Sequence, residues 1–171
     1  RKSASNQEYS ILLFIFSLLS GVLAAPPPPP IVTRIGFGSC MHQSHPQEIW
    51  KAIGEKNPQL FILLGDNIYA KSIAEKKEAY ALLRAKPTYS EFQKKVPVYS
   101  IWDDNDFGTS DSGAEFPFKK ESKELFLEFF NVPKDSDRRS HEGIFDSVIF
   151  GPNGKKIQLL LLDTRWFRSP P

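Results

Sequence analysis

Three short segments of this 171-residue sequence carry side chains that can bind cations, and each segment follows an apolar run. These side chains are the thiol of Cys40, the carboxylate and phenol of Asp66 and Tyr69, and the adjacent carboxylates of Asp103 and Asp104. Oxygen ligands suit calcium, magnesium or manganese, whereas a thiolate or phenolate suits iron or a softer divalent metal. Two neighbouring cations could clamp a phosphoryl group and activate a water molecule, provided that the three segments meet in space.

Each segment also has a simpler interpretation. Asp66, between Gly65 and Asn67, fits a turn, because Asp and Asn side chains bond their own backbone. Tyr69 by itself fits core packing, and Cys40 by itself fits a small buried apolar residue. The run 103–106 is harder to explain in this way, because its three carboxylates repel one another unless a cation or other partners intervene. The structural alternative to a cation site is a plain domain in which this run is a solvated turn.

The elements that must position these side chains follow from hydrophobic periodicity. Alternating or continuous apolar runs predict strands, and apolar residues at helical spacing predict helices. The predicted strands are 31–37, 60–64, 98–102, 144–150 and 157–162, and the predicted helices are 47–55, 74–85 and 120–130. Pro87 is expected to end the second helix, and residues 151–154 are expected to form a hairpin turn.

The resulting order, βαβαβαββ, predicts an α/β layered fold in which the first three strands are parallel. Ligands of open α/β sheets bind at the carboxyl ends of the strands. Right-handed crossovers would place the ends of the first three strands at one edge of the sheet, so we expect the three cation-binding segments to converge there.

Composition and charge limit the classes of function. The chain is 40% hydrophobic and 25% charged, which is typical of a globular protein and too apolar for a disordered one. The net charge of +2 offers no electrostatic case for nucleic acid as a partner. A single cysteine excludes an intrachain disulfide framework and a Cys-rich zinc site.

The N-terminal region has the pattern of a targeting segment. Arg1 and Lys2 precede an apolar run at 11–23, which is shorter than the roughly 20 residues that span a bilayer. Small residues follow, so we expect residues 1–25 to be a cleaved signal peptide, with a short membrane anchor as the alternative. Residues 26–30 are all proline and predict a polyproline linker. The mature protein is then expected to be secreted or in the secretory pathway, without stable membrane insertion.

Several blocks, taken together and in this order, resemble the PhoD-like alkaline phosphatase family of the calcineurin-like metallophosphoesterases. The blocks are Phe37-Gly38-Ser39-Cys40, Gly65-Asp66-Asn67-Ile68-Tyr69-Ala70, Trp102-Asp103-Asp104-Asn105-Asp106-Phe107-Gly108 and Leu161-Leu162-Asp163-Thr164-Arg165-Trp166-Phe167-Arg168. The resemblance implies a partial αββα metallophosphoesterase sandwich with a mostly parallel sheet. It also implies metal-dependent hydrolysis of a small phosphate ester, by a phosphomonoesterase or phosphodiesterase that uses two or more metal ions, iron and calcium among them.

The resemblance further implies metal-binding roles for the residues already singled out. Cys40 and Tyr69 would ligate iron, and Asp66 would contact or bridge the metals. Asp103 and Asp104 would hold the second cation.

Two further residues would take part in catalysis by the same resemblance. Arg165 would bind phosphate or pack beside it, with a surface ion pair to Asp163 as the alternative. Asn105 stands where the family usually has histidine. An amide can donate a hydrogen bond, but it cannot act as a general acid near neutral pH.

Family domains continue beyond the last block into a second half that completes the metal site. We therefore expect residues 31–171 to be an incomplete PhoD-like metallophosphatase domain with weak or no activity by itself. A non-catalytic, secreted metal- or ligand-binding relative of the family is the alternative function.

Overall fold

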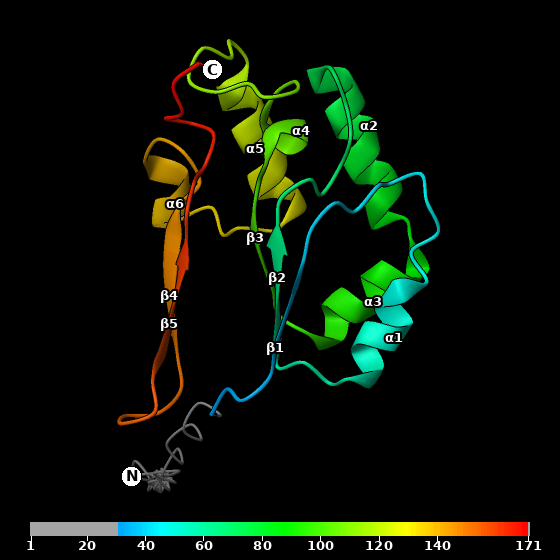
Figure 1. Ribbon diagram of the computed structural model, residues 1–171, viewed down its shortest axis with the longest axis vertical. Coiled ribbons are helices and arrows are strands. Elements are labelled where there is room, and N and C mark those ends of the chain that lie inside the picture. Colours follow the sequence, from blue (N-terminus) through cyan, green and yellow to red (C-terminus); the bar gives the residue numbers. More distant parts are fainter. Residues whose placement is uncertain (1–30, 171) are drawn as a thin grey trace, which may run out of the picture.

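The computed structural model describes residues 31–170 and contains two β-sheets (Figure 1). Strands β1 (Ile35–Gly38), β2 (Leu60–Leu64) and β3 (Val98–Ile101) form a parallel sheet in the order β1-β2-β3. Strands β4 (Asp146–Phe150) and β5 (Ile157–Leu161) form an antiparallel hairpin. The predicted α/β class, the parallel arrangement of the first three strands and the final hairpin are thus confirmed. The predicted signal peptide and polyproline linker lie outside the described residues.

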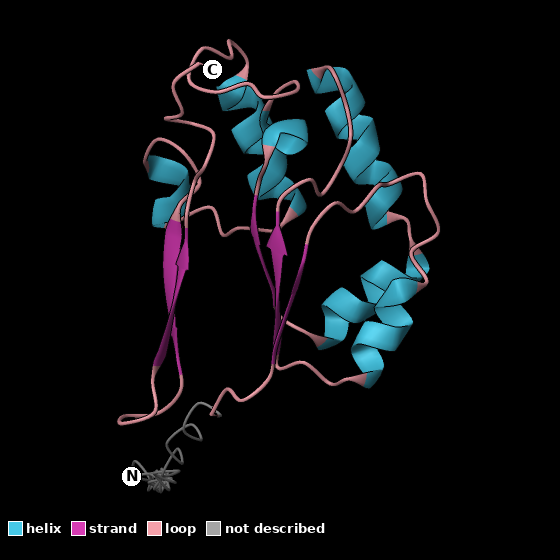
Figure 2. Cartoon of the chain, viewed as in Figure 1, coloured by secondary structure: helices cyan, strands magenta, loops and turns pink. Residues whose placement is uncertain are grey.

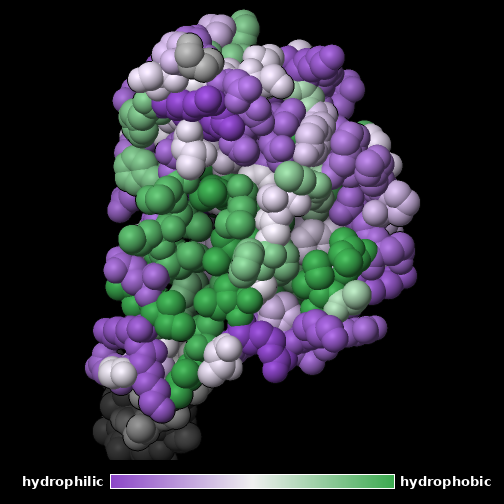
Figure 3. Space-filling model, in the orientation of Figure 1, coloured by the Kyte–Doolittle hydropathy of each residue, from purple (hydrophilic) through white to green (hydrophobic). Residues whose placement is uncertain are grey.

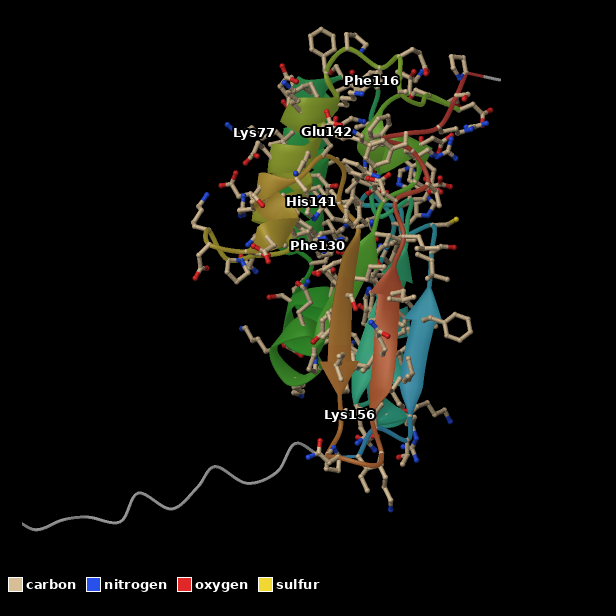
Figure 4. The ribbon with its side chains drawn as sticks, turned by 90° about the vertical axis from the view of Figure 1, so that its left-hand side faces the viewer. Lys77, Phe116, Phe130, His141, Glu142 and Lys156 are labelled. Carbon is tan, nitrogen blue, oxygen red and sulfur yellow. The ribbon has the colours of Figure 1, made fainter. Side chains whose placement is uncertain are left out.

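Most of the helices lie on one side of the strands in the view of Figure 4, and Figure 2 shows the antiparallel hairpin beside the parallel sheet. The helices are α1 (Ile49–Glu55), α2 (Ile73–Arg84), α3 (Pro87–Lys95), α4 (Asp104–Phe107), α5 (Lys119–Phe129) and α6 (Asp137–Ser140). Helix α1 packs against α3, and α2 packs against α5. None of the helices within the described region is long and apolar enough to cross a membrane.

Three of these helices are absent from the sequence-based prediction. Pro87, expected only to end the preceding helix, occupies the first turn of α3, where its missing N–H leaves no bond unmade. Helix α4 is a single turn closed by a capping box, in which the side chains of Asp103 and Asp106 each accept from the other residue's backbone N–H. Helix α6 is also a single turn. Such short elements bury too few residues to produce a periodic pattern.

An aromatic core fixes the sheet to the helices. Trp50 of α1 packs edge-on against Phe61 of β2, with ring centroids 5.2 Å apart, and also contacts Phe92 of α3. Nearer the carboxyl ends of the strands, Trp102 and Phe126 are fully buried and pack edge-on at 5.5 Å. The loops that follow β2 and β3 therefore begin from rigidly packed positions.

Buried Arg138 of α6 connects the two sheets. Its guanidinium donates to the carbonyl of Ser100 in β3 and to the carbonyl of Ile144 just before β4, both at 2.6 Å. The rings of Tyr99 and Phe150 add an edge-on contact between β3 and β4. The hairpin is thus held beside β3 by side chains rather than by a backbone ladder.

A broad apolar area covers the strands on the face seen in Figure 3. Large apolar side chains of the strands are exposed to solvent in both sheets: Ile35, Phe37, Leu64, Ile149, Ile157 and Leu160. Monomeric soluble proteins seldom expose continuous apolar patches larger than a few hundred Å².

This apolar area leads to a first prediction. We expect Leu160→Lys to lower the fluorescence of the apolar dye ANS without changing the melting temperature, because the side chain is 61% exposed and surface changes usually alter stability by less than about 0.5 kcal/mol. Leu161→Lys is the contrasting variant, since Leu161 is only 3% exposed and a buried lysine should unfold the hairpin. A lower melting temperature for Leu160→Lys would show that this side chain contributes to packing.

Candidate metal centre

The loops after β1 and β2 hold Cys40 and Asp66 close to each other. The Cys40 N–H donates to the carbonyl of Gly65 at 3.2 Å, and the Met41 N–H donates to the carbonyl of Asp66 at 2.8 Å. Cys40 and Asp66 both have left-handed backbone conformations, with φ of 62° and 53°. Residues other than glycine rarely adopt this region, and such strained positions are concentrated at functional sites.

Gly65 allows the ends of β2 and β3 to approach each other. Its φ is +107°, and a Cβ atom at this position would lie 2.6 Å from Cβ of Asp103 and 2.7 Å from the Asp103 backbone nitrogen. Any other residue would therefore push the two strand ends apart. Gly65 thus brings the Asp66 carboxylate next to that of Asp103.

The three predicted carboxylates converge at this edge of the sheet. Asp66, Asp103 and Asp104 each present a carboxylate oxygen, and these oxygens all lie within 4.8 Å of one another. No basic side chain among residues 31–170 forms an ion pair with Asp66 or Asp104. The cluster therefore carries negative charge that a bound cation would balance.

The predicted thiol and phenol flank the same carboxylate. The Tyr69 hydroxyl donates to Oδ2 of Asp66 at 3.1 Å, and Sγ of Cys40 lies 4.0 Å from that oxygen. Burial raises the pKa of Tyr69, and the hydrogen bond to Cys40 and the charge of Asp66 raise it further. The phenol is therefore neutral at physiological pH in the absence of a cation. The structure places all five predicted metal-binding side chains together.

Asn105 and Arg165 also lie in the cluster. The Asn105 amide donates to Oδ1 of Asp66 and to Oδ1 of Asp104, both at 3.1 Å. Arg165 directs Nε and Nη2 to Oδ1 of Asp103, each at 2.5 Å. The alternative surface pair between the side chains of Arg165 and Asp163 is not formed. Asp163 instead accepts from the Trp102 indole at 2.8 Å and from the Arg165 backbone N–H at 2.9 Å.

The surroundings of Asp104 favour the charged form of its carboxylate. Burial alone would raise its pKa, but a hydrogen bond from the Asp111 backbone N–H, at 2.8 Å, and the positive charge of Arg165 lower the pKa below its ordinary value. Asp104 is therefore available as an anionic ligand well below neutral pH.

Asp106, which was not among the predicted site residues, supports the cluster through backbone contacts. Its fully buried carboxylate accepts from the backbone N–H groups of Asn67, at 3.0 Å, and of Asp103, at 3.1 Å. Burial raises the pKa of Asp106 to about 7. The Asp-x-x-Asp spacing of Asp103 and Asp106, which is that of a capping box, is the sequence feature that could have indicated this supporting role. Asp106 thus ties the loop after β2 to the start of α4.

Lys76 of α2 is a second supporting residue that was not predicted. It is fully buried, and its ammonium donates to the carbonyls of Asn105 at 2.8 Å and Gly108 at 2.7 Å. Burial lowers the pKa of Lys76 to about 8. Lys76 lies four residues before buried Tyr80 and seven before buried Leu83, so it belongs to the apolar stripe of the helix. This helical spacing is the sequence feature that could have indicated a buried lysine.

The donor set fits metal ions. Clustered carboxylates suit hard cations such as calcium, and the thiol and phenol beside Asp66 suit iron or a softer divalent metal. Arg165 neutralises Asp103, whereas Asp66 and Asp104 receive hydrogen bonds from a neutral amide. These residues could thus hold a cation.

An open parallel sheet with helices on one side and an acidic cluster at its carboxyl edge defines the class of this chain as α/β. No family model and no curated protein matches the sequence. Among solved structures, PhoD is similar, with a TM-score of 0.64 and 16% sequence identity over 85% of this chain. The fold is therefore PhoD-like, and the chain spans about a third of the length of PhoD, since the match covers 34% of it.

Proposed function

We propose that this protein hydrolyses phosphate esters with the help of metal ions held by the side chains of the acidic cluster. The convergence of Asp66, Asp103 and Asp104 with the Cys40 thiol and Tyr69 phenol at one sheet edge is the observation that carries the proposal. The PhoD-like fold supports it. In this proposal the metals are iron and calcium. When bound, they supply positive charge to the phosphoryl oxygens and activate a water molecule.

Arg165 supplies a phosphate-binding group. Its side chain is mostly buried, and Nη1 is buried without a hydrogen-bond partner among residues 31–170, although Oδ1 of Asp111 lies 3.9 Å away. A buried guanidinium N–H without an acceptor is unfavourable. Guanidinium groups bind phosphate oxygens well, so a substrate phosphate would supply the missing acceptor.

In the proposed reaction, a water oxygen forms a bond to phosphorus as the bond from phosphorus to the ester oxygen breaks. The attacking water releases a proton to solvent, and the departing alcohol oxygen takes up a proton. Arg165 would hold the phosphoryl group, while the Asn105 amide keeps the carboxylates of Asp66 and Asp104 oriented. Asn105 itself cannot provide the proton, so solvent must do so.

A non-catalytic metal- or ligand-binding relative is the second candidate. The absence of a titratable group at position 105 and the neutralisation of Asp103 by Arg165 favour it. Both candidates take residues 1–25 as a signal peptide and the mature protein as secreted.

Metal analysis and an activity assay separate the two candidates. The purified full chain would be analysed for metals and then assayed with 4-nitrophenyl phosphate, with and without added calcium and iron. Stoichiometric metal together with metal-dependent turnover supports the hydrolase. Stoichiometric metal without turnover supports the binding relative, and a chain that takes up no metal contradicts both.

Asn105→His tests the role of this position in catalysis. We expect kcat for 4-nitrophenyl phosphate to rise by about tenfold or more, because general acids typically contribute at least a hundredfold and an imidazole can protonate the leaving oxygen near neutral pH. Asn105→Gln is the control, since it keeps the amide but adds no titratable group. An equal kcat for the two variants would show that position 105 does not limit the reaction.

A further inference from the structure

A hollow of about 350 Å³ lies directly beside the candidate metal centre, between strand β1 and helix α1. Its apolar lining includes Met41, Ile49, Trp50 and Leu63, and Cys40 forms part of the same wall. Hollows of roughly 300–1,000 Å³ with a mainly apolar lining and a few polar groups are typical of small-molecule sites. Because Cys40 belongs to both, the hollow and the candidate metal centre share a wall.

Gly38 and a floor of packed aromatic rings border this space. A Cβ atom at Gly38 would meet only the Phe61 ring, at an ordinary contact distance of 3.5 Å, so the glycine leaves room above that ring. Phe61 is itself held by Trp50, with ring centroids 5.2 Å apart, and by Phe92 at 5.6 Å. The floor of the hollow therefore does not depend on side chains that would collapse into it.

Stacked polar rings join the hollow to the metal centre. His42, which lines the hollow, stacks on Tyr69 with ring centroids 4.9 Å apart, and on His45 at 4.6 Å. Tyr69 in turn donates to the carboxylate of Asp66. A larger apolar hollow of about 560 Å³ is lined by Phe116 and Phe118 instead and includes none of the proposed metal-binding residues.

We propose that the hollow beside Cys40 binds the organic group of the phosphate ester and selects esters of aromatic alcohols over esters of small or polyhydroxylated alcohols. The inference rests on the proposed hydrolase function, because the phosphate must lie at the metal centre for its organic group to reach the hollow. Rings pack well against the aromatic and aliphatic side chains that make up most of this lining. The polar side chains of the lining are few (Ser39, His42, His45 and Gln47), and the Gln47 amide is already hydrogen-bonded, so hydroxyl groups of a polyol would lose more water contacts than they regain.

The test compares two phosphonates, whose carbon–phosphorus bond is not hydrolysed. Binding of phenylphosphonate and methylphosphonate to the full chain would be measured by calorimetry in the presence of calcium and iron. We expect phenylphosphonate to bind more tightly. Ile49→Gln should weaken its binding about fourfold, the equivalent of one buried methylene group, and leave methylphosphonate unchanged.

Ile149→Gln is the matched control, because Ile149 of β4 is 60% exposed, as is Ile49, but does not line the hollow. It should change neither affinity. Equal binding of the two phosphonates, or equal weakening of both by Ile49→Gln, would overturn the inference while turnover of 4-nitrophenyl phosphate still supported the hydrolase. A preference for the phenyl compound without turnover of any ester would support the hollow and contradict the hydrolase. Failure of both compounds to bind would overturn the inference, and it would overturn the hydrolase as well only if 4-nitrophenyl phosphate were not turned over.

Discussion

Asp66→Ala should abolish metal retention and lower the rate of phosphate-ester hydrolysis by at least about 100-fold, since even the outer partners of metal ligands contribute 10- to 100-fold. Asp66 lies at the centre of the site: its two oxygens receive hydrogen bonds from Tyr69 and Asn105, and Cys40 lies 4.0 Å away. Its removal separates the thiol and phenol from the carboxylates that follow β3. Metal content per chain and kcat/KM for 4-nitrophenyl phosphate are the measurements.

Asp135→Ala provides the comparison for this variant, because Asp135 is exposed in a loop away from the cluster. It removes the same charge and should retain both metal and activity. If Asp66→Ala kept its full metal content, Asp66 would not be a ligand. A loss of metal in both variants would indicate a general effect of charge.

Lys76→Met should lower the free energy of unfolding by about 3 kcal/mol, because removal of one partner from a buried charged network typically destabilises by 3–5 kcal/mol. Methionine fills similar space but leaves the carbonyls of Asn105 and Gly108 without their donor. The Coulombic attraction between Lys76 and the buried Asp106 is lost as well. Urea unfolding followed by circular dichroism measures the change.

Lys77→Met is the control for this second variant. Lys77 is the next residue of α2 and is exposed, so its replacement should change the free energy of unfolding by less than about 0.5 kcal/mol. Similar stabilities for the two variants would mean that the ammonium of Lys76 does not support α4. Loss of the Lys76 ammonium should also disturb the candidate metal centre, since α4 carries Asp104 and Asn105.

Much of the fold followed from local pattern. The continuous apolar run at 60–64 and the apolar segment at 157–162 correspond closely to β2 and β5. Convergence of the site followed from topology, because side chains after parallel strands share one edge. The single turns α4 and α6 were missed because they carry no periodicity.

The supports of the site were harder to infer than the site itself. The pairing of Arg165 with Asp103 joins residues far apart in the sequence, and local spacing favoured Asp163 instead. Lys76 and Asp106 are buried, whereas lysine and aspartate side chains are usually expected at the surface. Their roles depend on contacts between α2, α4 and the loop after β2, and these exist only once the chain is folded.

The apolar strand faces of Figure 3 affect how the protein must be handled in solution. Sulfate and phosphate salts strengthen the tendency of apolar surfaces to leave water. A net charge of only +2 provides little repulsion between copies. We therefore expect precipitation at ammonium sulfate concentrations that leave most proteins of this size dissolved, and strong retention on a phenyl-substituted chromatography resin. Because the exposed strand faces are apolar, the protein should be purified at low concentration in a low-salt buffer.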